Sequence, residues 1–233
     1  MPTTRGTLIV FEGLDRSGKS TQCERLINHL RQQGRGVEAL RFPNRSTPIG
    51  QMINSYLAGE TQTEDHVVHL LFTANRWESA AEIERLVGKG TCVVIDRYYY
   101  SGCVYTAAKQ EDSMGLEWCR QPEVGLPRPD ICIFLDISAE KAMSRGGFGA
   151  ERYEKRELQD RVRGLFGELR QARDEGQDTT VIDGGASVED VEMEIRKVVA
   201  DAMRKVNEGA TPLRRVEAWG GPDGWYDPEV TTQ

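Results

Sequence analysis

Five short runs rich in β-branched and other apolar residues limit the fold of this chain more than any other feature. They span residues 7–12, 37–42, 91–96, 131–137 and 179–184. Most are apolar at successive positions, which is typical of strands buried on both faces of a parallel sheet. Longer segments with helical periodicity separate the runs, so the sequence predicts an α/β fold with helices on both faces of a parallel sheet.

The predicted helices continue to about residue 207, and no internal repeat interrupts them. They cover residues 19–33, 48–58, 65–87, 157–175 and 188–207. Residues 208–233 are rich in Gly and Pro and have no sustained period. We therefore expect one domain over residues 1–207, followed by a C-terminal tail over residues 208–233.

Charge and cysteine content exclude several classes of protein. The net charge of −7 argues against a nucleic-acid or membrane-surface partner, because such proteins usually carry a basic excess. The five cysteines are odd in number and include no C-x-x-C pair, so buried free thiols in a reducing compartment are expected. The N-terminus has no signal-peptide pattern and no apolar run could span a membrane, so we expect the cytoplasm, with the nucleus as a second possible location.

The first apolar run leads into a glycine loop, GLDRSGKS, at residues 13–20. The glycines let several backbone N–H groups point inward at an anion, and the helix that follows adds its N-terminal dipole. Lys19 can reach the β- and γ-phosphates, and the Ser20 hydroxyl can bind Mg²⁺. This motif predicts a site for a nucleoside triphosphate with Mg²⁺.

The third apolar run ends in the pair Asp96-Arg97, at the carboxyl edge of the predicted sheet, where ligands bind in open parallel sheets. Asp96 can hold the metal through water, and Arg97 can bind a second phosphate with its planar fork. The second run leads into FPNRSTPIG, which carries Phe42 and Arg45. A second arginine near the phosphates favours a monophosphate acceptor, although a strand-end salt bridge and a surface arginine would fit the same residues.

The helix predicted over residues 65–87 carries two kinds of face. Its apolar stripe, expected to face the core, consists of Val67, Leu70, Leu71, Ala74 and Trp77. Phe72 and Arg76 lie four residues apart on the opposite face. Phe72 could stack on a flat base while Arg76 donates to a carbonyl on its edge, but a second packing layer or a subunit contact explains the pair equally well.

A lid is predicted at about residues 144–156, where SRGGFGAERYEK contains three glycines within four residues. Such a segment cannot form a stable helix interior. Its flanking arginines, Arg145 and Arg152, suit a hinged loop that closes over phosphates and expels water. A plain flexible loop would have the same composition.

Taken together, these segments resemble the thymidylate kinase family, most closely its eukaryotic type. The matching stretches are FEGLDRSGKSTQ, RFPNRSTPIG, HLLFTANRWE, VVIDRYYYSG, QPEVGLPRPDICIFLDI, RGGFGAERYE and PLRRVEAW. The resemblance implies transfer of the γ-phosphoryl group of ATP to thymidine 5′-monophosphate (dTMP) with Mg²⁺. It also implies a three-layer P-loop fold with a five-stranded parallel sheet and a glycine-rich lid, and a homodimer often formed through the helix that carries Phe72.

The resemblance also assigns roles to individual residues. Arg16, Lys19, Asp96 and Arg97 would be catalytic, with Ser20 and Asp96 at the metal. The implied ATP site comprises Arg16, Ser17, Gly18, Lys19, Ser20, Thr21 and Arg145. In the implied acceptor site, Arg45 and Arg97 bind the phosphate, Asp15 the sugar 3′-hydroxyl, and Phe72 and Arg76 the base. Tyr105 lies near the 2′ position, Gln159 contacts the acceptor from the lid side, and Phe42 and Gly102 complete the site. The lid residues would be Arg145, Gly146, Gly147, Gly149, Arg152 and Tyr153.

Two alternatives stay open at the level of sequence. A kinase for another nucleoside monophosphate or for a deoxynucleoside would use the same loop, and a deoxynucleoside kinase would need a carboxylate base, for which Glu12 is in the right region. A non-catalytic nucleotide-binding protein is the other class. The presence of Arg16, Lys19, Asp96 and Arg97 together argues against it.

Overall fold

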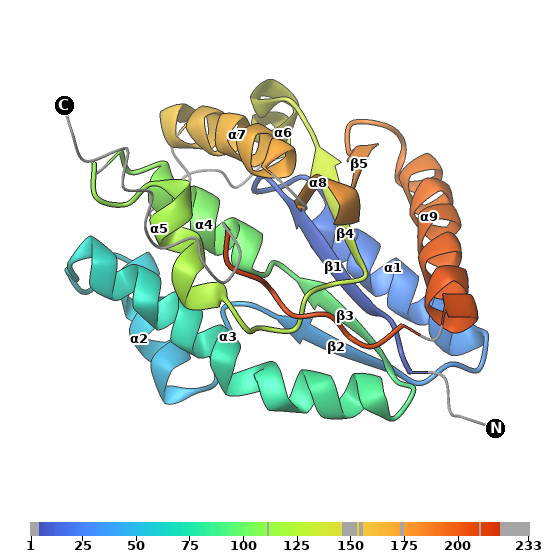
Figure 1. Ribbon diagram of the computed structural model, residues 1–233. Coiled ribbons are helices and arrows are strands. Elements are labelled where there is room, and N and C mark those ends of the chain that lie inside the picture. Colours follow the sequence, from blue (N-terminus) through green and yellow to red (C-terminus); the bar gives the residue numbers. More distant parts are fainter. Residues whose placement is uncertain are drawn as a thin grey trace, which may run out of the picture.

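The computed structural model describes residues 5–110, 112–145, 153, 156–172, 175–209 and 211–219. Its centre is a sheet of five parallel strands in the order β2-β3-β1-β4-β5 (Figure 1). The strands are β1 (Leu8–Gly13), β2 (Val37–Arg41), β3 (Cys92–Asp96), β4 (Ile131–Asp136) and β5 (Thr179–Asp183). The prediction of a five-stranded parallel sheet is confirmed, with each strand end within one residue of its expected position.

Helices connect the strands along the chain. They are α1 (Lys19–Gln32), α2 (Pro48–Leu57), α3 (Asp65–Gly88), α4 (Tyr99–Ala107), α5 (Leu116–Arg120), the 3-10 helix η1 (Gln121–Glu123), α6 (Ala139–Ser144), α7 (Arg156–Gln171), α8 (Glu175–Asp178) and α9 (Val188–Gly209). The sequence did not predict α4, α5, α6 or α8. The helix expected over residues 157–175 ends earlier, at Gln171.

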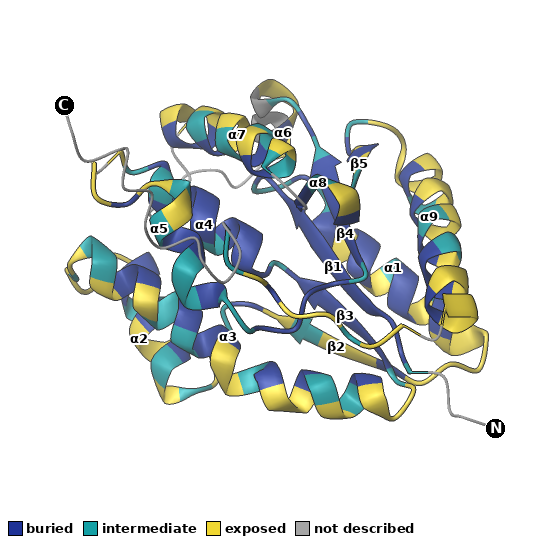
Figure 2. Cartoon of the chain, viewed as in Figure 1, coloured by how far each residue is buried: buried dark blue, intermediate teal, exposed yellow. Residues whose placement is uncertain are grey.

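The two largest of three apolar clusters lie on opposite faces of the sheet and make the fold a three-layer sandwich. The central strands are buried on both faces (Figure 2). Leu8 and Val10 of β1 pack into one core with α3, α4 and α7. Ile9 and Phe11 point to the opposite face and pack with α1 and α9. All five cysteines are buried and free, as predicted. Among the described residues, no helix combines the length and apolar character needed to cross a membrane.

The strand register brings the carboxyl ends of β1, β2 and β3 to one edge of the sheet. Asp96 at the end of β3 is in register with Phe11 of β1 and with Arg41 of β2. Gly13, where the glycine loop begins, lies two residues beyond Phe11 and is in register with Leu135 of β4. The polar residues that follow these strands meet at this edge, which is where parallel sheets bind ligands.

The predicted core face of α3 is wrong. Val67, Leu70 and Trp77 of the apolar stripe are 40–47% exposed, and Leu71 and Ala74 are only half-buried. The buried side chains instead include polar ones, each with a partner on another element. His69 bonds to Thr106, and Asn75 bonds to Asn44. Polar groups can be buried when they are hydrogen-bonded, so apolar content alone misidentified the inner face.

Helix α4 begins two residues after Arg97, and a buried carboxylate holds its first turn. Glu12 of β1 is fully buried and accepts hydrogen bonds from the backbone N–H groups of Tyr98 (2.8 Å) and Ser101 (3.0 Å). These are among the N–H groups that a helix start leaves without intrahelical partners. Glu12 also accepts from the Ser101 hydroxyl at 2.5 Å. A residue distant in sequence therefore anchors this helix.

Residues 211–219 run back along the loop that leads from η1 to β4. Backbone hydrogen bonds of 2.8 Å join Gly125 N–H to Val216 C=O and Val216 N–H to Leu126 C=O. The guanidinium of Arg120 lies 4.9 Å from the ring centre of Trp219. This part of the predicted tail therefore packs on the domain. Residues 220–233 lie outside the described part of the chain.

Candidate active site

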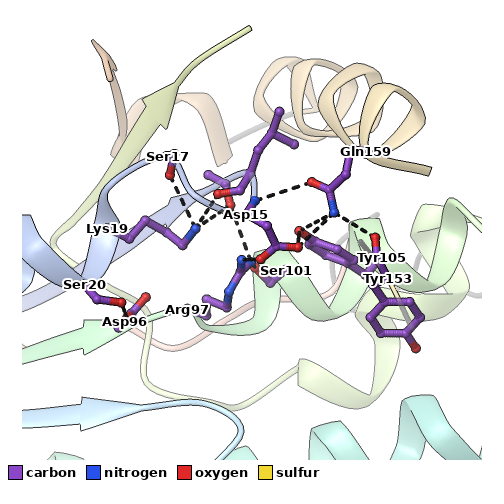
Figure 3. Close-up of polar contacts among 12 residues, drawn as sticks. Asp15, Ser17, Lys19, Ser20, Asp96, Arg97, Ser101, Tyr105, Tyr153 and Gln159 are labelled. Carbon is purple, nitrogen blue, oxygen red and sulfur yellow. Dashed lines mark hydrogen bonds and ion pairs between the residues drawn. The ribbon is translucent and has the colours of Figure 1, made fainter. Parts of the chain in front are cut away.

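The ammonium group of Lys19 is buried within the glycine loop. Lys19, the first residue of α1, donates from Nζ to the carbonyl oxygens of Gly13 (3.0 Å) and Leu14 (2.6 Å) (Figure 3). Burial, together with the nearby charge of Arg97, lowers the pKa of Lys19 to about 8. Gly13 has a φ of 141°, and a Cβ there would lie 2.5 Å from Leu135 O, so only glycine fits.

Ser20 and Asp96 form a pair suited to a hard divalent cation. The Ser20 hydroxyl donates to Oδ2 of Asp96 at 2.6 Å. The other oxygen of Asp96, Oδ1, is buried and has no hydrogen-bond partner. A hydroxyl and a carboxylate are oxygen ligands of the kind that Mg²⁺ prefers. Within the described residues, no cluster of three or more His, Cys, Asp or Glu side chains could hold a metal, so phosphates and water would have to complete this site.

A cleft of about 490 Å³ opens over the glycine loop. Its lining includes the six predicted residues Arg16, Ser17, Gly18, Lys19, Ser20 and Thr21. Arg145, at the end of α6, also lines it and bridges two segments. It donates from Nη1 to Arg16 O (2.9 Å) and from Nη2 to Gly184 O (2.7 Å). The sequence-predicted ATP residues are thus brought together in one cleft, which we call the donor cleft.

Arg97 lies between the glycine loop and α4. Its φ of 67° is unusual for a non-glycine residue, and its Nη1 donates to Gly13 O, at the end of β1, at 3.4 Å. The guanidinium forms an ion pair with Asp15 and donates to Ser101 Oγ at 3.0 Å. Ser101 in turn donates to Glu12. Arg97 is therefore held in place by hydrogen bonds that lead through Ser101 to the fully buried carboxylate of Glu12.

Asp15 joins the glycine loop to α4 and α7. Its Oδ2 accepts from Tyr105 Oη (3.1 Å) and from Gln159 Nε2 (2.9 Å) (Figure 3). Burial alone would raise the pKa of Asp15, but the charges of Arg97 and Lys19 and these two hydrogen bonds lower it. Asp15 is therefore ionised at neutral pH, and it can accept a hydrogen bond from a ligand hydroxyl.

A second, narrower cavity of about 240 Å³ lies beside Arg97. Its lining includes the predicted acceptor-site residues Asp15, Phe42, Arg45, Phe72, Arg76, Arg97, Gly102 and Tyr105, and also Tyr153 from the predicted lid. Gln159 does not line it, but donates to Tyr153 O at 3.0 Å. Arg45 is exposed and donates to Asn54 Oδ1 at 2.8 Å. We call this the acceptor cavity.

The donor cleft and the acceptor cavity share walls. Asp15, Arg41 and Arg97 line both. A ligand in either space therefore reaches the same arginine, and two ligands could meet end to end there.

Several residues of this site were not predicted from the sequence. Arg41 ends β2 and lies 3.8 Å from Asp96, and Tyr98, Ser101 and Thr106 line the acceptor cavity. The position of Arg41 at a strand's carboxyl end, the criterion that singled out Arg97, would have found it. The predicted lid residues Gly146, Gly147, Gly149 and Arg152 lie outside the described residues.

The sheet order, the glycine loop after β1 and the two adjoining cavities define a P-loop kinase of the nucleoside monophosphate kinase class. A family model described as thymidylate kinase matches residues 11–195. The chain belongs to the thymidylate kinase family, as its sequence motifs indicated.

Curated relatives are similar over most of their length. The chain is 45% identical to thymidylate kinase from Homo sapiens, covering 89% of this chain and 96% of that one. It is 46% identical to thymidylate kinase from Schizosaccharomyces pombe, covering 84% and 93%. A solved structure of thymidylate kinase from Candida albicans superposes with a TM-score of 0.81 at 34% identity, covering 91% of this chain and 98% of that chain.

Proposed function

We propose that this protein transfers the γ-phosphoryl group of ATP to dTMP, giving dTDP and ADP, a step toward dTTP. Family membership supports this reaction. The observation that carries it at the site is that Asp15, Arg41 and Arg97 line both the donor cleft and the acceptor cavity. Phosphoryl transfer needs two phosphates held in line, with positive charge where they meet.

On the donor side, the glycine loop and Lys19 would hold the β- and γ-phosphates, with Arg16 acting at the γ-phosphate. Ser17, Gly18 and Thr21 would add loop contacts, and Arg145 would cover the nucleotide from the lid side. Ser20 and Asp96 would hold Mg²⁺, which supplies charge neutralisation when bound. The unpartnered Oδ1 of Asp96 supports that assignment.

On the acceptor side, Arg97 and Arg45 would bind the phosphate of dTMP, with Phe42 beside them. Phe72 would stack on the base and Arg76 would donate to its carbonyl oxygen. Asp15 would accept from the 3′-hydroxyl, Tyr105 would crowd the 2′ position, and Gln159 would hold Asp15 and Tyr153. The acceptor is already an anionic oxygen, so the protein needs to position the phosphates and neutralise their charge rather than abstract a proton.

The burial of Glu12 counts against a deoxynucleoside kinase. Such an enzyme needs a carboxylate that reaches the acceptor hydroxyl. Glu12 lines neither the donor cleft nor the acceptor cavity, and both of its oxygens accept hydrogen bonds from the first turn of α4. A carboxylate in this position stabilises the first turn of α4 and, through Ser101, the position of Arg97; it does not reach a ligand to abstract a proton.

We also propose a homodimer that buries the outward face of α3. Val67, Leu70 and Trp77 are large, apolar and 40–47% exposed, and they follow one another at helical spacing. Adjacent exposed apolar side chains are typical of interaction sites. The five free thiols further support a reducing compartment such as the cytoplasm.

A coupled assay of ADP release tests the proposed reaction. The purified protein receives ATP, Mg²⁺ and, one at a time, each common nucleoside monophosphate and free thymidine. A Lys19→Ala variant purified in parallel controls for contaminating kinases. We expect dTMP to have the highest kcat/KM. Turnover of thymidine, or of another monophosphate in preference to dTMP, would overturn the proposal.

A further inference from the structure

Glu123 lies in the matching stretch QPEVGLPRPDICIFLDI but has none of the proposed roles, and it forms a fork around Arg76. It is the last residue of η1, and its side chain is fully buried. One oxygen accepts from Arg76 Nε at 2.9 Å, and the other accepts from Arg76 Nη2 and from Thr73 Oγ1 at 2.6 Å. Burial alone would lower the pKa of Arg76, but the charge and hydrogen bonds of Glu123 raise it, so the guanidinium is permanently charged.

This fork leaves one nitrogen of Arg76 for a ligand. Nε bonds to Glu123, while Nη2 bonds to Glu123 and, at 3.3 Å, to Thr73. Nη1 makes no hydrogen bond with any described residue, and Arg76 lines the acceptor cavity. A guanidinium has N–H donors and no acceptor. The cavity wall therefore offers a donor here, and a ligand must supply an acceptor.

Arg76 also has no room to turn away. Gly102 of α4 lies against it, and a Cβ at that position would be 2.6 Å from Nη2 and 3.0 Å from Cζ and Nη1. Glu123 holds two of its three nitrogens through hydrogen bonds. Because the guanidinium is held in this way, it cannot relax to accommodate a ligand that presents a second donor.

We propose that Glu123 is a positioning residue that makes the acceptor cavity select bases with a carbonyl oxygen, rather than an amino group, facing Arg76. This inference rests on the proposed function, because it concerns the base of the acceptor nucleotide. Thymine presents a carbonyl at the position where cytosine presents an amino group. An amino group would leave the Nη1 donor of Arg76 unpaired, and a site of this kind discriminates strongly.

The test compares kcat/KM for dTMP with kcat/KM for dCMP in the Glu123→Gln variant. Glutamine preserves the shape of the side chain but replaces one acceptor oxygen with a donor that faces a guanidinium N–H. We expect the dTMP-to-dCMP ratio to fall by about tenfold or more, mainly through a higher KM for dTMP. In an Arg76→Gln background, the same change should alter the ratio by less than about twofold, because Glu123 acts through Arg76.

A second buried pair provides the matched control. Glu175 pairs with Arg120, with side chains only 1% and 4% exposed, and neither residue lines the donor cleft or the acceptor cavity. Glu175→Gln should lower stability while leaving the ratio unchanged. Thr73→Val removes the hydrogen bond to Glu123 and the 3.3 Å bond from Arg76 Nη2, but no charge. It should lower the ratio less, and it supplies the test if Glu123→Gln fails to fold.

A folded Glu123→Gln variant whose ratio stays within about twofold of wild type overturns this inference, as does an equal fall in the Glu175→Gln control. Where Glu123→Gln does not fold, an unchanged ratio in Thr73→Val overturns it. A wild-type protein that does not phosphorylate dTMP overturns the proposed function instead, so the two failures are distinguishable.

Discussion

Replacing Gly102 with alanine tests how closely α4 and Arg76 must approach. The added Cβ would lie 2.6 Å from Arg76 Nη2, and Arg76 is held by Glu123. Alanine is favoured over glycine within a helix by about 1 kcal/mol. Overpacking a filled interior costs about 1–3 kcal/mol. We therefore expect Gly102→Ala to lower the free energy of unfolding by about 0–2 kcal/mol, a small net change.

The effect on the acceptor should be larger than the effect on stability. A displaced guanidinium loses a hydrogen bond between a charged donor and the base, which is worth about 1.5–3 kcal/mol. The KM for dTMP should then rise by about 10- to 100-fold, while the KM for ATP changes little. Steady-state kinetics with each substrate varied in turn measure both constants, and urea unfolding measures stability.

Gly164, in the middle of α7, is the matched control because nothing lies within 4 Å of its Cβ position. Gly164→Ala should stabilise the protein by about 1 kcal/mol with both KM values unchanged. If Gly102→Ala gave the same gain in stability and a normal KM for dTMP, the close approach of Gly102 to Arg76 would have no functional meaning and this reasoning would be refuted.

Three further predictions concern charge. Arg97→Ala should lose at least about 3 kcal/mol of transition-state stabilisation, measured as kcat/KM, and near-normal turnover would contradict its role between the two phosphates. Burial lowers the pKa of Lys19 to about 8, so the free enzyme loses the ammonium proton as pH rises through that value, and kcat/KM for ATP should fall. A kcat/KM for ATP that stays constant well above pH 8 would contradict the role of the Lys19 charge. Burial lowers the pKa of His69 to about 4 in the folded protein. As pH falls, His69 is therefore protonated in the unfolded chain before it is protonated in the folded protein, and the free energy of unfolding should drop by about 2 kcal/mol between pH 7 and pH 5. Urea unfolding of a His69→Gln variant should show less of this drop, and an equal drop would assign it to other groups.

The strands and the glycine loop could be predicted because their signals are local. A strand buried on both faces is apolar at successive positions, so β1, β3 and β4 can be recognised from a few adjacent residues. The glycine loop depends on backbone freedom at fixed spacing, and its function follows from the strand before it and the helix after it. Both predictions needed no knowledge of distant parts of the chain.

The missed features depend on partners far away in the sequence. Helix α4 starts with a run of tyrosines of modest helix propensity, and its first turn is held by Glu12, 86 residues before Tyr98. The inner face of α3 carries Arg76, whose burial is possible only because Glu123, 47 residues later, neutralises it. Glu12 and Glu123 lie outside the sequence windows from which α4 and α3 would be predicted. For α3, hydrophobic periodicity therefore identified the wrong face as the buried one.

The most direct test of the account measures whether the two cavities bind one continuous ligand. A linked analogue, in which the 5′ oxygens of adenosine and thymidine are joined through a chain of phosphates, would place one nucleoside in each cavity. We predict that a single molecule binds per chain, competes with both ATP and dTMP, and binds far more tightly than either nucleotide alone. An analogue that competes with only one substrate, or binds no better than that substrate, would contradict the shared wall at Arg97.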